Sequence, residues 1–366
     1  MPKNIKNIFY KNLTFEKLMQ AHKRAKKHKT YKNELIQFEF NLENNIINLM
    51  NQLKNKTYRL GKYFVFKVYE PKERMIQALP YKDRIIHQWY VEEFIKPYIV
   101  PKFIPTTYAC LTNKGTHKAV EEVSRQMRIC QRNMGTFWIL KCDIHKFFYN
   151  IHPYTLFEIM KRYISDYDLL HLTKIFIFNG DVNKENVGIP IGNYTSQFFA
   201  NIYLNELDQY IKRVLKIKYY TRYMDDFILI LNTKQECIEI KKKIELFLEE
   251  KLKLKLNDKS RYYPSKMGVN FCGYRIFTTH KLLRLSSKKK IKKNIKKWNH
   301  QFEIGNLDIN HTIQSLNSWI GHSSHCNSYH LQQKMLKSCN FLFQDNTSAV
   351  LEKQLLEDIL NNNKYY

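Results

Sequence analysis

The sequence predicts an α+β protein in which helices back an antiparallel sheet, and three observations carry this prediction. Apolar and polar side chains alternate on both sides of a turn-like segment near residue 70, which indicates a hairpin. Two further strand-like runs lie within residues 219–231. Apolar residues recur at helical spacing through residues 14–56 and again after residue 286.

The N-terminal elements follow in order. Residues 14–56 are expected to be helical, and their basic cluster between His22 and Lys29 either tracks phosphates or forms a solvated face. Strands over 63–69 and 74–79 should pair across a turn, with Asp83 then capping a helix that runs to about Tyr98.

The composition indicates an ordered globular protein with a polyanionic partner. The 366 residues carry a formal charge of +28, far more than solubility requires, which favours nucleic acid and leaves a ribosome- or membrane-surface-seeking protein as the alternative. Seven cysteines without a CxxC pair indicate a reducing compartment. The N-terminus has no signal-peptide core and no apolar run reaches membrane-spanning length, so a soluble cytoplasmic location without membrane contact is expected.

Three aspartates carry the candidate chemistry. The apolar run 137–142 ends in Asp143, which would need a cation or a water-filled cleft to stay ionised. Asp225 and Asp226 lie in a tight turn between two strand-like runs, and divalent metal would relieve their repulsion. Two such ions support the in-line phosphoryl transfer that builds a polynucleotide, although an isolated Asp-Asp pair is also an ordinary turn pair.

The surrounding motifs carry a close resemblance to reverse transcriptases, which covers roughly residues 60 to 330. The matching segments, in order, are Asp143–Phe148 for the upstream metal motif, Gly188–Gln197 for the nucleotide loop, Tyr223–Asp226 for the YxDD box, Leu254–Lys259 for the following palm motif and Phe271–Tyr274 for the primer grip. The resemblance implies a right-hand polymerase with an antiparallel palm sheet, fingers and a helical thumb. It also implies RNA-directed DNA polymerase activity with two Mg²⁺ ions, for which Mn²⁺ is a possible substitute.

The sequence of the nucleotide loop resembles that of one particular group of reverse transcriptases. Most reverse transcriptases carry Pro-Gln-Gly where this chain has Pro190-Ile191-Gly192, and the pattern here is similar to that of diversity-generating retroelements. Those enzymes copy a template-repeat RNA with errors at adenines and so diversify a target gene by mutagenic retrohoming. Ile191 cannot donate the hydrogen bond of the glutamine it replaces, which is consistent with loosened nucleotide positioning.

The same resemblance assigns roles to individual residues. Catalytic and metal-binding roles go to Asp143, Asp225 and Asp226, with the Ile144 carbonyl as a further metal ligand. Nucleotide contacts go to Lys67, Arg74, Phe148, Ile191, Gly192 and Gln197, with Lys72 as a weaker candidate. The primer grip comprises Phe271, Cys272, Gly273 and Tyr274, and Lys259 is a possible general acid, although a lysine in a basic stretch is more often an ordinary surface charge.

The C-terminal region resembles a thumb. Ser286-Ser287 should cap a helix whose apolar stripe is Ile291, Ile295, Trp298 and Phe302. Its lysines would bind backbone phosphates of an RNA–cDNA hybrid; they include Lys288, Lys289, Lys292, Lys293 and Lys296. The His and Cys residues of 318–330 match no common zinc-finger spacing, so zinc is not expected. A last amphipathic helix is expected over 348–360.

These observations predict an N-terminal helical basic extension over 1–60, interleaved fingers and palm over 61–285, and a helical thumb with a C-terminal helix over 286–366. The expected partners are template RNA, cDNA and dNTPs, together with the small basic pentameric accessory protein implied by the resemblance, in a bacterial or phage-encoded system. The alternatives are another bacterial reverse transcriptase, of group II intron, retron or phage-defence type, and a catalytically silent RNA-binding protein with the same fold.

Overall fold

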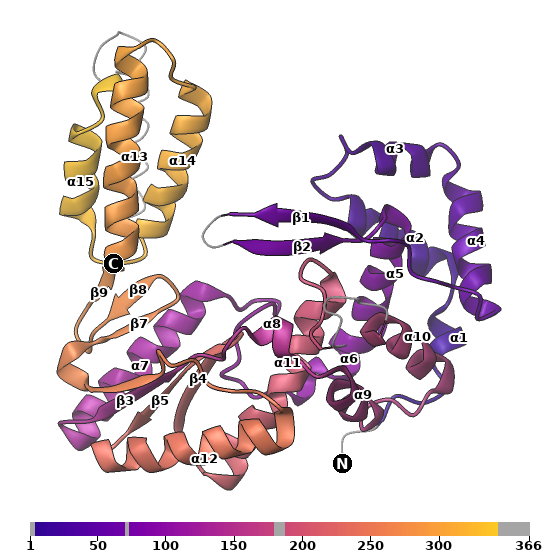
Figure 1. The fold of residues 1–366 in the computed structure, drawn as a ribbon, viewed down its shortest axis with the longest axis horizontal. Coiled ribbons are helices and arrows are strands. Elements are labelled where there is room, and N and C mark those ends of the chain that lie inside the picture. Colours follow the sequence, from indigo (N-terminus) through magenta and orange to yellow (C-terminus); the bar gives the residue numbers. More distant parts are fainter. Residues whose placement is uncertain (1–3, 70–72, 179–186, 343–366) are drawn as a thin grey trace. The chain divides into compact units, whose positions relative to one another are not determined.

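The computed structural model describes residues 4–69, 73–178 and 187–342, and it divides into two compact units. Of the described residues, the first unit comprises those within 4–113, 141–229 and 235–261, and the second comprises 114–140, 230–234 and 262–342. Helices and separate small sheets alternate along the chain, which agrees with the predicted α+β class (Figure 1). The expected domain boundaries at 60 and 285 stay a prediction. Lys72 and the helix expected over 348–360 lie outside the described residues.

Helices form the N-terminal part of the first unit, as the spacing predicts. They are α1 (Phe9–Asn12), α2 (Phe15–Lys26), α3 (Asn33–Glu39) and α4 (Leu42–Lys54). Thr14 caps α2 by accepting a hydrogen bond from the backbone N–H of Lys17. The basic cluster is not one uniform surface, because His22 is buried against Tyr81 and Lys26 forms an ion pair with Glu39.

The predicted hairpin is present as β1 (Phe64–Val68) and β2 (Arg74–Ala78), which pair antiparallel. The helix after it, α5 (Tyr81–Tyr90), packs against α2. The expected cap at Asp83 is wrong, because α5 already begins at Tyr81 after Pro80. The buried Asp83 carboxylate instead accepts hydrogen bonds from the Tyr58 hydroxyl and the Gly61 N–H, so it joins the start of the hairpin segment to α5.

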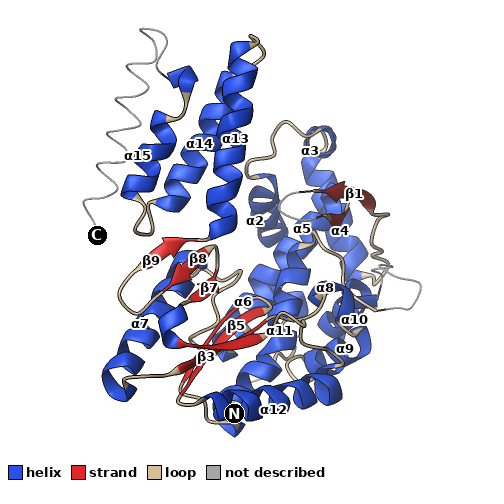
Figure 2. Cartoon of the chain, turned by 60° about the vertical axis from the view of Figure 1, so that its left-hand side comes forward, coloured by secondary structure: helices blue, strands red, loops and turns tan. Residues whose placement is uncertain are grey.

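A four-stranded sheet has the strand order β4-β5-β3-β6. Its strands are β3 (Trp138–Cys142), β4 (Tyr219–Tyr223), β5 (Asp226–Leu231) and β6 (Arg261–Pro264). A two-residue turn joins β4 to β5, so these strands run antiparallel as predicted. Figure 2 shows β3 and β5 side by side, with α12 (Lys234–Leu252) near them. Every residue of β3 and β5 is buried or half-buried, as their apolar sequences predict.

The rest of the first unit is helical. Its remaining elements are η1 (Val91–Ile95), α6 (Lys96–Tyr98), η2 (Val100–Lys102), α8 (Phe147–Asn150), α9 (Pro153–Lys161), α10 (Tyr167–Phe178), α11 (Tyr194–Gln209) and η3 (Tyr210–Val214). Helix α11 is buried on most of its positions, including the polar residues Asn201, Asn205 and Asp208. Buried polar groups at the centre of a helix require partners, so α11 has to supply more than apolar packing.

The second unit contains α7 (Thr116–Met134) and a small antiparallel sheet of β7 (Val269–Phe271), β8 (Tyr274–Ile276) and β9 (Lys281–Leu283). The one-turn helix η4 (Ser265–Met267) precedes β7. Three helices follow, namely α13 (Leu285–Glu303), α14 (Ile309–Ser323) and α15 (Tyr329–Lys337), and then η5 (Asn340–Leu342).

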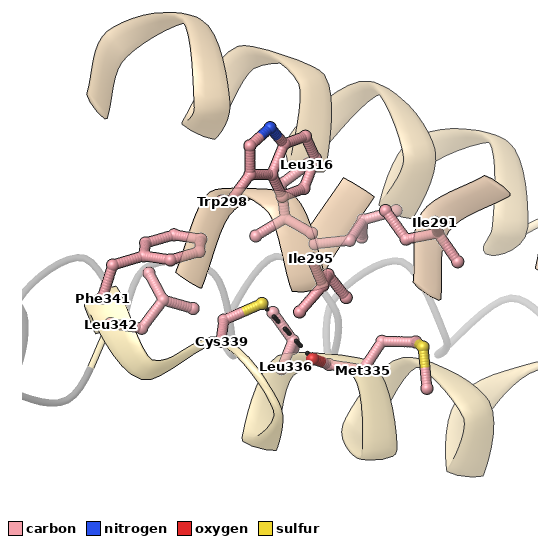
Figure 3. Close-up of a cluster of buried hydrophobic side chains, with 10 residues drawn as sticks. Ile291, Ile295, Trp298, Leu316, Met335, Leu336, Cys339, Phe341 and Leu342 are labelled. Carbon is pink, nitrogen blue, oxygen red and sulfur yellow. Dashed lines mark hydrogen bonds between the residues drawn. The ribbon is translucent and has the colours of Figure 1, made fainter. Parts of the chain in front are cut away.

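The predicted apolar stripe of α13 forms the centre of this helical group. Ile291, Ile295 and Trp298 are buried with Leu316 of α14 and Leu336 of α15 (Figure 3). The expected serine cap is wrong, because α13 begins at Leu285 and Arg284 occupies the N-cap position without a side-chain hydrogen bond. Ser286 and Ser287 therefore lie inside the first turn. In the described residues, no helix is long and apolar enough to cross a membrane.

Candidate active site

The turn between β4 and β5 presents two of the predicted carboxylates. Met224 and Asp225 form the turn, and Asp226 is the first residue of β5. Met224 has φ +55°, a left-handed conformation that is uncommon for a residue with a side chain. Burial, together with the negative charge of Asp143, raises the pKa of Asp225 to about 6, although the positive charges of Arg74 and Arg222 act in the opposite direction. Asp143 therefore lies close enough for its charge to act on Asp225.

Asp143 follows β3 directly and is held from the segment after α12. The backbone N–H of Asn257 donates to the Asp143 carbonyl at 2.7 Å, and its side-chain amide donates to Oδ2 at 3.2 Å. The Asp143 N–H donates to Ser260 Oγ at 3.1 Å. Ile144 forms an isolated antiparallel bridge with Leu256, and the two hydrogen bonds beside it involve Asp143 and His145 rather than the Ile144 carbonyl.

Asp226 is paired with a lysine that sequence reasoning missed. Lys141 Nζ lies 3.0 Å from Asp226 Oδ2, and both side chains are largely shielded from solvent. Burial nevertheless raises the pKa of Asp226 to about 6, although Lys141 lowers it, and Asp143 and Asp225 add to the increase. Asp226 Oδ1 is buried and has no hydrogen-bond partner within the described part of the chain.

These features fit a divalent cation. Carboxylates whose charged form is disfavoured by burial and mutual repulsion, one with an unpartnered oxygen, would be stabilised by positive charge. In the described ranges, no three His, Cys, Asp or Glu side chains are gathered closely enough to form a metal site by themselves. Mg²⁺ commonly takes only one or two protein carboxylates and fills its other positions with water and substrate phosphates, so a complete protein cage is not required.

The nucleotide loop packs against both the hairpin and α8. The Ile191 carbonyl accepts a hydrogen bond from the Gln77 N–H in β2 at 2.8 Å. At Gly192, with φ +125°, an added Cβ would lie 2.9 Å from the Gln77 carbonyl oxygen. At Gly188, with φ +94°, it would lie 2.9 Å from the Tyr149 carbonyl oxygen. Only glycine meets both the close approach and the left-handed backbone at these positions.

The other predicted nucleotide contacts occupy varied surroundings. Phe148 is half-buried in α8, and its carbonyl accepts from the Ile189 N–H at 2.9 Å. Arg74 begins β2 and its charge acts on Asp225, whereas Lys67 pairs with Glu73 at 2.7 Å on the exposed hairpin. Gln197 is exposed on α11.

Lys259, the possible general acid, is exposed beside the residues that hold Asp143. Its backbone N–H donates to Asn257 Oδ1 at 3.1 Å, which fixes the local turn.

An open groove of about 730 Å³ lies beside the nucleotide loop within the first unit. Its lining combines basic residues of the α2–α3 region and α5 with aromatic residues of β1 and residues of the nucleotide loop; they include Lys29, Tyr31, Lys32, Phe64, Arg84 and Asn193. Basic side chains interleaved with aromatic rings are typical of surfaces that bind single-stranded nucleic acid.

The predicted primer grip and thumb lysines belong to the second unit. Cys272 and Gly273 both have positive φ and form the two-residue turn between β7 and β8, where Phe271 pairs with Tyr274. The Tyr274 hydroxyl donates to the His322 carbonyl at 2.7 Å, which ties this hairpin to α14. The predicted lysines of α13 lie outside its buried stripe, and all except the half-buried Lys288 are exposed.

Several residues that hold the site were not assigned roles from the sequence. Lys141 lies two positions before Asp143, so strand periodicity would place both on one face of β3. Asn257 lies inside a matched motif, but its partner depends on tertiary structure. Arg222 is fully buried behind the turn, and no sequence pattern indicates a buried charge in a strand of otherwise ordinary composition.

The sequence matches a known class of protein. The family model described as reverse transcriptase (RNA-dependent DNA polymerase) matches residues 65–276, which is more than half of the chain. The chain belongs to the reverse transcriptase family, and the predicted right-hand polymerase fold class is confirmed.

The chain is similar to two curated relatives. Protein YkfC of Escherichia coli strain K12 is 27% identical over 252 residues, which cover 57% of this chain and 66% of that protein. The group II intron-encoded protein LtrA of Lactococcus lactis subsp. cremoris is 23% identical over 305 residues, which cover 64% of this chain and 50% of LtrA. The chain thus spans less than two thirds of either relative.

Among solved structures, telomerase from Candida albicans in complex with a fragment of telomeric RNA aligns with a TM-score of 0.48 at 11% identity. That alignment covers 85% of this chain and 59% of the telomerase chain.

Proposed function

We propose that the protein is an RNA-directed DNA polymerase that extends a primer on a template RNA. The observation that carries the proposal is that Asp225 and Asp226 lie at the β4–β5 turn while Asp143 directly follows β3, the strand next to β5, in a chain of the reverse transcriptase family. Two divalent ions, Mg²⁺ or Mn²⁺, would supply activation of the primer 3′-hydroxyl and stabilisation of the leaving pyrophosphate.

Within this proposal each residue has a limited task. Asp143 and Asp225 hold the metals, with the Ile144 carbonyl as a further ligand, and Asp226 supports them with its charge shared by Lys141. Arg74 binds the triphosphate, since its positive charge already acts on the Asp225 carboxylate.

The other assigned residues bind substrate rather than metal. The half-buried Phe148 ring lies under the sugar and excludes a 2′-hydroxyl, and the loop with Ile191 and Gly192 lies under the incoming nucleotide. Lys259 is the proposed general acid toward pyrophosphate. The groove lined by Lys29, Tyr31 and Phe64 would bind the single-stranded template.

Primer extension tests this proposal. Wild-type protein with a primed RNA, dNTPs and Mg²⁺ should make cDNA, whereas Asp225→Ala should reduce the rate by several orders of magnitude because a metal ligand is lost. The matched control is Glu250→Ala, which removes an exposed acid of α12 in the same unit and should leave extension unchanged. No extension by wild type would support the silent RNA-binding alternative, whereas equal extension by wild type and Asp225→Ala would contradict the role of Asp225 as a metal ligand.

For the biological role we propose a diversity-generating retroelement, with cDNA errors at adenines. The support is Ile191, which has no hydrogen-bond donor where the nucleotide loop of most reverse transcriptases carries glutamine. The proposed partners are the structured retroelement RNA and a small basic pentameric accessory protein. A neighbouring pair of near-identical DNA repeats that differ at adenines is expected beside the gene.

The group II intron type is the second candidate, because LtrA is an intron-encoded relative. Intron ribozyme sequence flanking the gene, in the absence of near-identical repeats that differ at adenines, would support the group II intron type.

A further inference from the structure

A buried ion pair lies directly behind the catalytic turn. Arg222 of β4 donates from Nε to Asp208 Oδ1 at 2.7 Å and from Nη2 to Oδ2 at 2.6 Å, and both side chains are completely shielded from solvent. Asp208 belongs to α11 and also accepts from the Tyr220 hydroxyl at 2.6 Å and the Thr107 hydroxyl at 2.9 Å. The carboxylate is thus satisfied on both oxygens, and the guanidinium is held in one orientation.

The third nitrogen of this guanidinium, Nη1, contacts the turn between β4 and β5. Arg222 Nη1 donates to the Met224 carbonyl at 2.9 Å and to Asn201 Oδ1 at 3.1 Å. The Met224 carbonyl shares a planar peptide with the N–H of Asp225, so fixing the oxygen fixes the plane from which the Asp225 side chain starts. Met224 has φ +55°, a conformation that costs on the order of 1 kcal/mol and persists only where neighbours impose it.

The backbone of Arg222 is fixed as well. Its N–H donates to the Thr106 carbonyl at 3.0 Å, and its carbonyl accepts from the Tyr108 N–H at 3.0 Å. Arg222 therefore cannot follow a displaced turn without breaking the contacts of its guanidinium to α11 or those of its backbone to the segment 106–108.

Stability alone is a poor explanation for this arrangement. Transfer of two charges from water into the protein interior costs desolvation free energy, and well-packed apolar residues commonly replace a buried ion pair without loss of stability. What apolar residues cannot do is donate a directed hydrogen bond to the Met224 carbonyl.

We propose that Arg222, oriented by Asp208, is a positioning residue that fixes the Met224–Asp225 peptide and thereby aims the Asp225 carboxylate at the divalent metal. This inference rests on the polymerase function proposed above. Arg222 touches neither substrate nor metal in this scheme, since it acts through the turn.

The test removes both charges together, because Arg222 alone cannot be deleted without leaving the Asp208 carboxylate buried and unpaired. The double variant Asp208→Leu/Arg222→Met should fold and should weaken Mn²⁺ binding, followed by Mn²⁺ electron paramagnetic resonance without substrate, by about 10-fold or more. Its kcat should fall on the order of 10²-fold while KM for dNTP changes little, since a displacement of about 1 Å has such an effect on the chemical step.

Arg222→Lys is the second variant. Lysine keeps the positive charge opposite Asp208 but has no guanidinium that can contact both Asp208 and the Met224 carbonyl. Its Mn²⁺ affinity should therefore fall as well, but by less than in the double variant. The matched control is Arg162→Met/Glu206→Leu, which removes another arginine–carboxylate pair that involves α11 but lies at the surface, and its Mn²⁺ affinity should equal that of wild type.

The outcomes are distinct. Variants that lose thermal stability but bind Mn²⁺ and turn over like wild type would show that the pair is only structural and would overturn the proposal. A double variant that does not fold leaves the decision to Arg222→Lys, in which wild-type Mn²⁺ affinity would overturn the proposal equally. If wild type binds Mn²⁺ through Asp225 but makes no cDNA, the polymerase function fails while the positioning role of Arg222 is still decided by the Mn²⁺ measurement.

Discussion

Lys141 Nζ donates to Asp226 Oδ2 at 3.0 Å, across the contact between β3 and β5. The pair compensates part of the charge at a turn where burial and neighbouring aspartates raise the pKa of Asp226 to about 6. β5, which begins at Asp226, and β3, which directly precedes Asp143, are thereby joined by one ion pair, independently of any metal.

Loss of this lysine should change how stability depends on pH. A carboxyl group whose pKa is higher in the folded than in the unfolded chain binds protons more tightly when folded, so stability falls as pH rises from about 4 towards the folded pKa. Lys141→Met should raise the Asp226 pKa further, extend this fall to higher pH and cost on the order of 1–2 kcal/mol at pH 7. Urea denaturation in EDTA between about pH 4 and 8 measures the free energy of unfolding of both proteins as a function of pH.

The control for Lys141→Met is Lys161→Met, which removes a lysine paired with Glu158 on an exposed helix face. Its pH profile should follow that of wild type. Identical profiles for wild type and Lys141→Met would show that Lys141 does not moderate the Asp226 charge.

Neutralising Asp225 should stabilise the metal-free protein. Its pKa is raised to about 6, so the carboxylate is ionised at pH 7 against the preference of its surroundings. Asp225→Asn should therefore raise the free energy of unfolding at pH 7 in EDTA, by on the order of 1–2 kcal/mol.

Added Mg²⁺ should make wild type the more stable of the two proteins, since the ion stabilises wild type by mass action and binds Asp225→Asn only weakly. Thermal melting with and without Mg²⁺ checks both signs. A variant less stable than wild type in EDTA would contradict the prediction.

The local elements could be predicted from the sequence because they depend on short-range patterns. Alternation placed the hairpin within one or two residues of β1 and β2, and the apolar run before Asp143 became β3. The cap at Asp83 failed because Pro80 starts α5 earlier and the carboxylate is used by Tyr58 and Gly61. When a side chain bonds to a segment far away in the sequence, the residues next to it do not reveal that contact.

The same distinction applies to the site. The candidate aspartates were assigned from motifs, whereas the support of Asp143 by Asn257 and the orientation of Arg222 by Asp208 depend on contacts between separate elements. Those contacts follow from packing of whole elements.

Gly192→Ala should disrupt nucleotide binding through the backbone alone. The added methyl would lie 2.9 Å from the Gln77 carbonyl oxygen at φ +125°, so the loop would have to move away from β2. We expect KM for dNTP to rise on the order of 10-fold, measured by steady-state primer extension. Gly321→Ala in α14 is the matched control, because its Cβ meets nothing within 4 Å and activity should be unchanged.

Phe148→Ala should relax the choice of sugar. A half-buried ring proposed to lie under the ribose excludes a 2′-hydroxyl by its volume, so its loss should raise the incorporation of ribonucleotides relative to deoxynucleotides on the order of 10-fold or more. The ratio of kcat/KM values for rNTP and dNTP measures this. Phe157→Ala, which shortens a half-buried aromatic of α9, should leave the ratio unchanged; an unchanged ratio for Phe148→Ala as well would remove its proposed role.

Ile191→Gln should lower misincorporation opposite template adenine. The Ile191 backbone carbonyl is already bound to the Gln77 N–H, so the substitution changes the side chain while the loop keeps its position. A glutamine amide can donate the hydrogen bond that an apolar branched side chain cannot, and a directed polar contact discriminates more strongly than shape alone. Sequencing of cDNA made on one defined RNA gives the error rate at each base.

Ile191→Leu is the control for this last change, because leucine preserves volume and apolar character and should keep the wild-type error rate. If Ile191→Gln and Ile191→Leu show equal errors opposite adenine, the side chain at this position does not set fidelity. The low-fidelity interpretation of the loop would then lose its physical basis, while the polymerase function would stand on the aspartates alone.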